Sequence, residues 1–317
     1  MLRMVLPSLV VNGDCWERLL MVMGAWLMVP RAGSGASLAM TSFTLSGCRA
    51  VITGASSGLG AEFARQLAPR ASALMLVARG EAALEAVRAE CARVNAALRV
   101  ELCAADLADE QGRGEVERRL AESRFGPDLL INNAGMGDYG SLATADPAKL
   151  RLMLDLNMTA PVLLTRALLP LLRRPGGILN VSSLAGELPM PDTACYAASK
   201  AFMTRFSLAL SVELEAEGVA VACVCPGPTP TGFSKAARRP DGTDTDRAGQ
   251  GVLRQPPEAV VAAALRTLEN GGPLVFPGAG VKAAACLFRH LPRFVLHRLL
   301  RARHARAKVS AAPPPPK

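Results

Sequence analysis

The chain has 317 residues and a formal net charge of +9; half of its residues are hydrophobic and only 4% are aromatic. This composition is typical of a globular α/β protein and excludes fibrous and intrinsically disordered classes. Nine basic residues and no acidic ones lie in 282–317, so residues 1–281 carry no net charge, and nothing predicts nucleic acid as a partner.

The histidines and cysteines narrow the chemistry further. All three histidines, His290, His297 and His304, lie in 282–317. The rest of the chain therefore lacks the side chain that Ser-His-Asp hydrolases and histidine zinc sites require, and we expect no metal. The eight cysteines contain no CxxC pair, and we expect them to be reduced in a cytoplasmic protein.

Residues 1–39 differ from the remainder because they have no periodicity that predicts a helix or a strand. We expect an extension outside the working fold, disordered or not translated, with Met40 as the alternative start of translation. The competing interpretation is a membrane-associating anchor built on Leu19–Pro30, a run too short to cross a bilayer.

From residue 48 onward, short apolar runs alternate with stretches of helical spacing. The predicted strands are 49–53, 73–78, 98–104, 128–132, 176–182, 219–225 and 273–276. The predicted helices are 59–69, 81–95, 109–123, 147–172, 194–217 and 257–269, and residues 232–255 are expected to form a mobile loop. Continuous apolar strands separated by helices predict a doubly wound parallel sheet, Rossmann-like, in a single domain over 40–280.

Residues 281–317 form the basic tail. Helices are expected at 283–290 and 293–308, with a disordered end. The expected apolar side of the second helix is Leu291, Phe294, Val295, Leu299 and Leu300, opposite Arg293, His297, Arg298, Arg301 and His304. Two interpretations stay open: a helix packed on the domain with a solvated basic face, or peripheral contact with an anionic membrane.

The sequence TGASSGLG at 53–60 joins the first predicted strand to the first predicted helix. Glycines there let the backbone approach a pyrophosphate, and the helix N-terminus offers free N–H groups and a positive dipole end. At the end of the second predicted strand, Arg79 stands where an NAD site would carry an acidic residue. Because a guanidinium suits a 2′-phosphate, NADP is favoured over NAD.

Tyr196 and Lys200 are four residues apart on a predicted helix and so share one face. An ammonium group favours the phenolate and lowers the pKa of a tyrosine from its ordinary value of about 10. Ser182 and Ser183 end the preceding predicted strand, and Asn157 lies in an otherwise apolar helix. An amide in that position is expected to have a partner or a function.

These motifs follow one another in an order that resembles the short-chain dehydrogenase/reductase family over roughly residues 44–280. They are TGASSGLG (53–60), ADL (105–107), NNAG (132–135), Asn157, SS (182–183), YAASK (196–200) and PGPTPT (226–231). The resemblance implies an NADP(H)-dependent oxidoreductase that transfers a hydride between a nicotinamide and a carbonyl or alcohol carbon.

The resemblance also implies residue roles. Tyr196 is the general acid and base, Lys200 binds the nicotinamide ribose, and Ser183 hydrogen-bonds the substrate oxygen. Asn157 holds a water in a proton relay. The residues it implies for the cofactor are Thr53, Gly54, Ser56, Ser57, Gly58, Leu59, Gly60, Arg79, Asp106, Leu107, Asn133, Ala134, Gly135, Tyr196, Lys200, Pro226, Gly227, Thr229 and Thr231.

Two departures from the family pattern concern the pocket rim and assembly. The last strand ends in Phe276-Pro277-Gly278 rather than a glycine-rich DGG element, and the basic tail is absent from compact members. The pocket is expected from 184–193, Tyr139 and the 232–255 loop, whose apolar residues favour a lipophilic small-molecule substrate. A homo-oligomer is expected. The alternative function is a redox-silent NADP-binding regulatory or scaffold protein.

Overall fold

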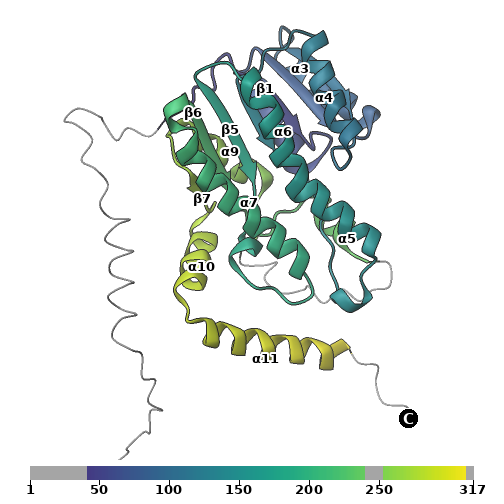
Figure 1. Ribbon diagram of the computed structural model, residues 1–317, viewed down its shortest axis with the longest axis vertical. Helices are drawn as coiled ribbons and strands as arrows, with labels where there is room; N and C mark the ends of the chain where they lie inside the picture. Colours follow the sequence, from purple (N-terminus) through teal and green to yellow (C-terminus); the bar gives the residue numbers. More distant parts are fainter. Residues whose placement is uncertain (1–40, 240–252, 312–317) are drawn as a thin grey trace, which may run out of the picture. The chain divides into compact units, whose positions relative to one another are not determined.

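The computed structural model describes residues 41–239 and 253–311 (Figure 1). The expected extension over 1–39, the Met40 start and much of the expected 232–255 loop lie outside the described residues. The strands are β1 (Arg49–Thr53), β2 (Ala73–Ala78), β3 (Arg99–Ala104), β4 (Leu129–Asn132), β5 (Gly176–Val181), β6 (Val219–Val224) and β7 (Leu274–Val275).

These strands form one parallel sheet in the order β3-β2-β1-β4-β5-β6-β7. The first strand lies between β2 and β4, with Ala50 opposite Leu74 on one side and Leu129 on the other. The strand order reverses between β1 and β4, and such a reversal opens a crevice at the carboxyl ends of the strands. The predicted doubly wound, Rossmann-like sheet is confirmed.

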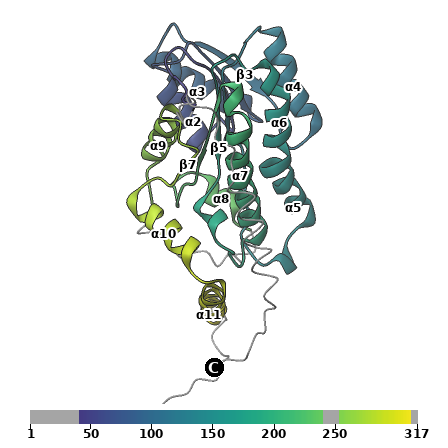
Figure 2. The same ribbon diagram turned by 60° about the vertical axis from the view of Figure 1, so that its left-hand side comes forward.

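Helices cover both faces of the sheet, as Figure 2 shows. One face carries α2 (Gly58–Leu67), α3 (Glu81–Val94) and α9 (Pro257–Glu269), and the other α4 (Glu110–Glu122), α6 (Ala160–Leu168) and α7 (Ala194–Glu213). Alternate residues of each strand enter the two cores: Ile52 packs on the α2 side and Val51 on the α6 side. Because helices cover both faces of the sheet, side chains on both sides of a strand are buried, and the strand sequences are continuous apolar runs.

The predicted helix 147–172 is interrupted. It consists of α5 (Pro147–Leu154), a π-helical turn η2 (Asp155–Thr159), α6, and a 3-10 turn η3 (Leu169–Leu171). The π turn carries the buried Asn157. By length and composition alone the stretch could cross a membrane. Its inner face, however, packs on the sheet through Ala160, Leu164 and Leu168, as expected of a core helix.

The structure corrects the sequence prediction at three other places. A short helix α8 (Phe233–Ala237) lies in the expected loop, and a 3-10 turn η4 (Leu184–Glu187) follows β5. Helix α10 (Ala279–His290) begins four residues earlier than predicted. Its N-cap is Gly278, which has a φ of 75°. The expected domain boundary at residue 280 therefore falls inside a helix.

The apolar side expected for the tail helix is wrong in part. In α11 (Arg293–Ala311) the buried residue is Leu296, whereas Phe294 is 69% exposed and Leu299 57% exposed. His304, expected on the polar side, contacts Asp192 at 3.1 Å between Nδ1 and Oδ2. The face of α11 that carries Leu296 and His304 is therefore the one turned toward the domain.

Candidate active site

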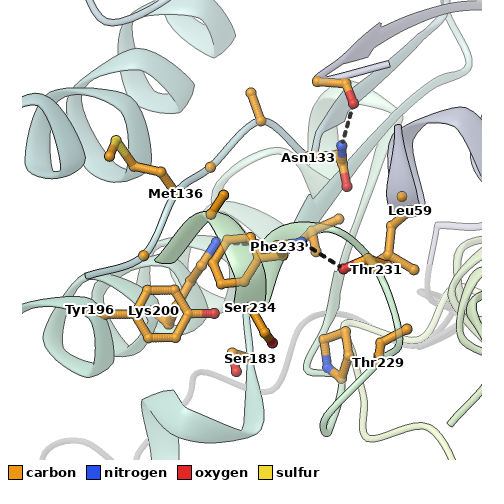
Figure 3. A pocket seen from close by; sticks show the side chains of 18 of the residues that line it. Leu59, Asn133, Met136, Ser183, Tyr196, Lys200, Thr229, Thr231, Phe233 and Ser234 are labelled. Carbon is orange, nitrogen blue, oxygen red and sulfur yellow. Dashed lines mark hydrogen bonds between the residues drawn. The ribbon is translucent and has the colours of Figure 1, made fainter. Parts of the chain in front are cut away.

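The glycine-rich turn after β1 leads directly into α2 at the mouth of the crevice (Figure 3). A Cβ on Gly60 would lie 2.0 Å from the carbonyl oxygen of Gly54, so only glycine lets the helix approach the strand end this closely. Ser57 is the N-cap of α2 without a side-chain capping bond, and the first turn carries no acidic residue. The first N–H groups of the helix are therefore suited to receive phosphate oxygens.

Hydrogen bonds between the ends of β1 and β4 fix the floor of the crevice. The Thr53 hydroxyl donates to the Ile131 carbonyl at 3.1 Å and accepts from the N–H groups of Asn133 at 2.9 Å and Ala134 at 3.0 Å. In return, Asn133 Nδ2 donates to the Thr53 carbonyl at 2.8 Å. Both polar side chains thus hold the two strand ends together.

Arg79 follows the last residue of β2 and is 72% exposed in its side chain. Its Nη1 lies 3.8 Å from Asp106 Oδ2, and both residues line the same cavity as the glycine-rich turn. An exposed guanidinium with one distant, half-exposed partner retains most of its donors. It is suited to a phosphate placed beside the turn.

Lys200 is 5% exposed, and its Nζ donates to the Val181 carbonyl at 3.0 Å. Burial lowers the pKa of this ammonium to about 8, although the nearby Cys223 and Cys225 thiols act in the opposite direction. Nζ lies 6.0 Å from the centre of the Tyr196 ring, one helical turn earlier in α7. A positive charge is therefore held beside the phenol.

Tyr196 is buried at the inner end of the cavity. Burial raises the pKa of its phenol well above the usual range, Tyr139 raises it further, and a hydrogen bond with Ser183 lowers it. In this environment the phenol is protonated at neutral pH. It can therefore donate a proton to an oxygen placed beside it.

The two neighbouring serines at the end of β5 have different partners. The Ser183 hydroxyl accepts from the Ala185 N–H at 3.1 Å, which caps η4, and it lowers the pKa of the nearby Tyr196 phenol. The Ser182 hydroxyl donates to the Lys200 carbonyl at 2.7 Å and lies 2.7 Å from Thr204 Oγ1. Ser182 thus supports α7, and Ser183 is the serine associated with the phenol.

Asn157 stands behind the cavity wall. Its Oδ1 accepts from the Met136 N–H at 2.9 Å, and its Nδ2 donates to the Met136 carbonyl at 2.9 Å and to Ser199 Oγ at 3.0 Å. A Cβ on Gly135 would lie 3.1 Å from Asn157 Oδ1 and 3.3 Å from Lys200 Nζ, so the loop after β4 passes between them. The water-holding role expected of Asn157 stays a prediction.

One cavity of about 850 Å³ joins these features. All the sequence-predicted site residues line it except Thr53, Gly60 and Asn157, which lie behind its walls. Figure 3 shows Tyr196, Lys200 and Ser183 on one side, and Leu59, Thr229 and Thr231 on the other. The lining therefore brings the expected catalytic and cofactor residues together.

The lining includes Phe233 and Leu253 from the expected 232–255 loop, whereas sequence reasoning missed the apolar lining residues Met136, Leu152, Leu156 and Phe288. The Phe233 ring lies 5.5 Å from the Tyr196 ring at an interplanar angle of 48°. It belongs to a helix of five residues, too short for periodicity to reveal. Phe288 could have been found, because Val281, Ala285 and Phe288 repeat at helical spacing.

The sequence model of the short chain dehydrogenase family matches residues 49–242. The very-long-chain 3-oxoacyl-CoA reductase of Podospora anserina is 35% identical over 205 residues, 60% of each chain. A hydroxysteroid 11-beta-dehydrogenase 1-like protein of Xenopus tropicalis is 33% identical over 58% of this chain and 66% of its own. The chain thus spans about 60% of the length of the first of these relatives.

Solved structures resemble the fold over a larger share. A short-chain dehydrogenase from Sphingobium yanoikuyae, in complex with NADPH, has a TM-score of 0.65 and 28% identity, covering 84% of this chain and 97% of its own. One from Burkholderia cenocepacia, in complex with NADP, has a TM-score of 0.66 and 28% identity, covering 81% and 99%. A 3-ketoacyl-(acyl-carrier-protein) reductase from Brucella melitensis is complexed with NADH, with a TM-score of 0.63 and 27% identity, covering 74% and 99%.

Proposed function

Because the chain belongs to the short-chain dehydrogenase/reductase family, we propose that it is an NADP(H)-dependent oxidoreductase of lipophilic carbonyl or alcohol compounds. The observation that carries the proposal is the meeting of Tyr196, Ser183 and Lys200 in one cavity that continues to the glycine-rich turn after β1. A nucleotide cradle and a proton donor in one continuous space favour transfer over simple binding.

The residues divide the work as follows. The nicotinamide, when bound, supplies or accepts the hydride at the carbinol carbon. In the reductive direction, Tyr196 donates its phenolic proton to the substrate oxygen, which Ser183 orients by a hydrogen bond. The ammonium of Lys200 then stabilises the phenolate that Tyr196 becomes. In the oxidative direction the phenolate takes the proton back.

The preference for NADP(H) rests on Arg79. Its guanidinium lies at the carboxyl end of β2, and no acidic side chain follows that strand directly. The residue is therefore suited to bind a 2′-phosphate, and it would leave a 2′-hydroxyl without its usual acceptor. Structural relatives in complex with NADPH or NADP support the same preference, although one relative holds NADH.

A lipophilic substrate is inferred from the apolar part of the cavity, which includes Leu188, Met190 and Phe233. Relatives named for 3-oxoacyl-CoA and hydroxysteroid compounds support this class. The alternative of a redox-silent binding protein finds no support in these names or in the intact set of polar residues around Tyr196.

The test is NADPH oxidation with a panel of ketones that differ in apolar bulk, run beside NADH. We expect turnover of bulky ketones with NADPH and its loss in Tyr196→Phe. Tight NADPH binding with no turnover of any ketone in either direction would contradict the proposal and favour the redox-silent alternative.

We further propose a cytoplasmic protein whose basic tail touches anionic membranes. Among the described residues the cysteines are free thiols, as in reducing compartments. Phe294 and Leu299 are exposed on α11 among Arg293, Arg298 and Arg301. Sedimentation with phosphatidylserine vesicles is expected to pellet the full chain, and less of a Phe294→Ser, Leu299→Ser variant. Equal pelleting of the two would exclude this contact.

We also propose a homo-oligomer. Leu163 of α6 is 46% exposed and Val212 of α7 is 73% exposed, and both helices cover the same face of the sheet. Exposed apolar side chains on adjacent helices favour a helix-to-helix interface between copies. The molar mass of the protein, measured by light scattering as it elutes from a gel-filtration column, tests this proposal. A monomer at micromolar concentration would contradict it.

A further inference from the structure

Helix α10 lies beyond the stretch that the family model matches, 49–242, yet it lines the cavity. Its inner face consists of Val281, Ala285 and Phe288, at i, i+4 and i+7. Val281 and Ala285 are buried against Leu184, the residue after Ser183. Phe288, one turn further, reaches the cavity itself.

Close packing fixes the N-terminal half of this helix. A Cβ on Gly227 would lie 2.7 Å from Val281 Cγ2 and 2.9 Å from the Leu253 carbonyl oxygen. The helix therefore packs directly on the backbone of the loop after β6, which lines the same cavity through Pro226 and Thr229.

An ion pair fixes the C-terminal half. Arg289 Nε lies 2.8 Å from Glu187 Oε2, and Arg289 Nη2 lies 3.2 Å from Glu187 Oε1, a bidentate pair. The Glu187 side chain is only 7% exposed, and the guanidinium lies 5.0 Å from the centre of the Phe276 ring. Glu187 ends the η4 turn that Ser183 caps, so this pair ties α10 to the catalytic serine's own segment.

We propose that α10 forms a wall of the substrate chamber and that Phe288 determines specificity, selecting carbonyl compounds with a long or bulky apolar group. The Arg289–Glu187 pair is the positioning device that holds this wall. The inference rests on the proposed oxidoreductase function and deepens it. Its physical basis is that burial of the Phe288 ring contributes binding free energy only when the substrate is long enough to cover that ring.

The test compares wild type, Phe288→Ala and Phe288→Leu on methyl ketones of increasing chain length. Leu287→Ala is the control, because Leu287 is adjacent but 57% exposed. We expect Phe288→Ala to lower kcat/KM about tenfold for the longest ketones, with Phe288→Leu intermediate and the shortest ketone unaffected. An equal effect on all lengths, or none, would overturn the proposal.

Calorimetric binding of the same ketones to the NADPH-loaded protein separates this inference from the function on which it rests. If wild type binds the long ketone without reducing it, the proposed function fails. The ratio of the affinities of wild type and Phe288→Ala for the long ketone then still tests the role of Phe288. Glu187→Gln tests the pair: we expect the same length-dependent loss, with the shortest ketone retained. A loss that is equal for all ketones would instead place Glu187 in support of Ser183 and overturn its assignment to the wall.

Discussion

The ammonium of Lys200 donates to the carbonyl oxygen of Val181 at 3.0 Å, at the last residue of β5. This bond holds the charge at the edge of the sheet, 6.0 Å from the centre of the Tyr196 ring, instead of leaving a flexible side chain to find the phenol. The site thus keeps a buried charge beside the group that becomes a phenolate in the proposed reaction. Such an arrangement costs folding free energy and benefits the reaction.

The first prediction concerns that cost. Burial lowers the Lys200 pKa to about 8, whereas an unfolded lysine has a pKa of about 10.4. The penalty is therefore full below the folded pKa and disappears as the pH rises towards the unfolded one. We expect Lys200→Met to increase the free energy of unfolding at neutral pH by roughly 1–3 kcal/mol, after subtracting the lost Val181 bond.

Urea unfolding of both proteins at neutral and alkaline pH measures this difference. The variant's advantage should shrink as the pH rises, while its turnover is abolished. A variant less stable than wild type at neutral pH would show that the buried charge is compensated by contacts beyond the Val181 bond.

The second prediction concerns the proton. Tyr196→Phe keeps the ring contact with Phe233, 5.5 Å between centroids, and removes the donor hydroxyl. We expect kcat to fall at least about a hundredfold, because positioned proton transfer contributes that much. The dissociation constant of NADPH, measured by fluorescence titration, should stay within a factor of about two, since the lost group faces substrate. Retention of most turnover would mean that another group donates the proton.

The third prediction concerns cofactor choice. Arg79→Ala removes the guanidinium that lies 3.8 Å from Asp106. Because a charge-assisted phosphate contact contributes about 1.5–3 kcal/mol, the KM for NADPH should rise about tenfold to a hundredfold. The KM for NADH should hardly change. Steady-state kinetics with both cofactors decides, and a wild-type enzyme that prefers NADH would contradict the assignment before any mutation.

The fourth prediction concerns a buried charge cluster beside the site. Asp138, 2% exposed in its side chain, accepts from Arg239 Nε at 3.1 Å and lies 2.9 Å from Lys149 Nζ. Bonding to Arg239, then to Lys149, lowers the Asp138 pKa against the opposing effect of burial. Asp138→Ala would remove the buried carboxylate that Arg239, 8% exposed, and Lys149 both contact, and should cost about 3–5 kcal/mol of stability.

The matched control is Glu122→Ala, whose partner Arg118 is 55% exposed, so its effect on stability should be much smaller. Denaturant unfolding gives both values. Since the Asp138 carboxyl has a lowered pKa, its contribution is present above its ordinary range and is lost as the pH falls through the folded value. Equal effects of the two substitutions would contradict the assignment.

Much of the fold could be predicted because the inner strands β2, β4, β5 and β6 are buried on both faces. Apolar runs such as 73–78 and 219–224 are short and lie between a turn and a predicted helix. Such runs are typical of strands that are buried on both faces of a parallel sheet. The glycine-rich connection at 54–57 and the polar residues at the strand ends then predicted the cavity. Nothing in the helical spacing of 147–172 could show the π turn around Asn157, because that turn depends on the Met136 backbone opposite.

The tail shows where local sequence fails. Amphipathic spacing placed Phe294 and Leu299 on the apolar side and His304 on the polar side, yet Leu296 and His304 are the residues that α11 turns to the domain. Asp192, which contacts His304, is more than a hundred residues earlier and has a φ of 63° in the loop before α7, so local sequence could not reveal this contact. The spacing of Val281, Ala285 and Phe288 indicates one helix face, but the cavity that Phe288 lines is formed by residues of other elements.

The central claim is that this cavity transfers a hydride and that Tyr196 completes the reaction with a proton. The most direct measurement uses NADPH with deuterium at the transferable position of the nicotinamide, together with a long-chain methyl ketone, and analyses the alcohol by mass spectrometry. The account predicts one deuterium on the carbinol carbon with wild type, and almost no alcohol with Tyr196→Phe. Alcohol without deuterium, or equal yields from the two proteins, would contradict it.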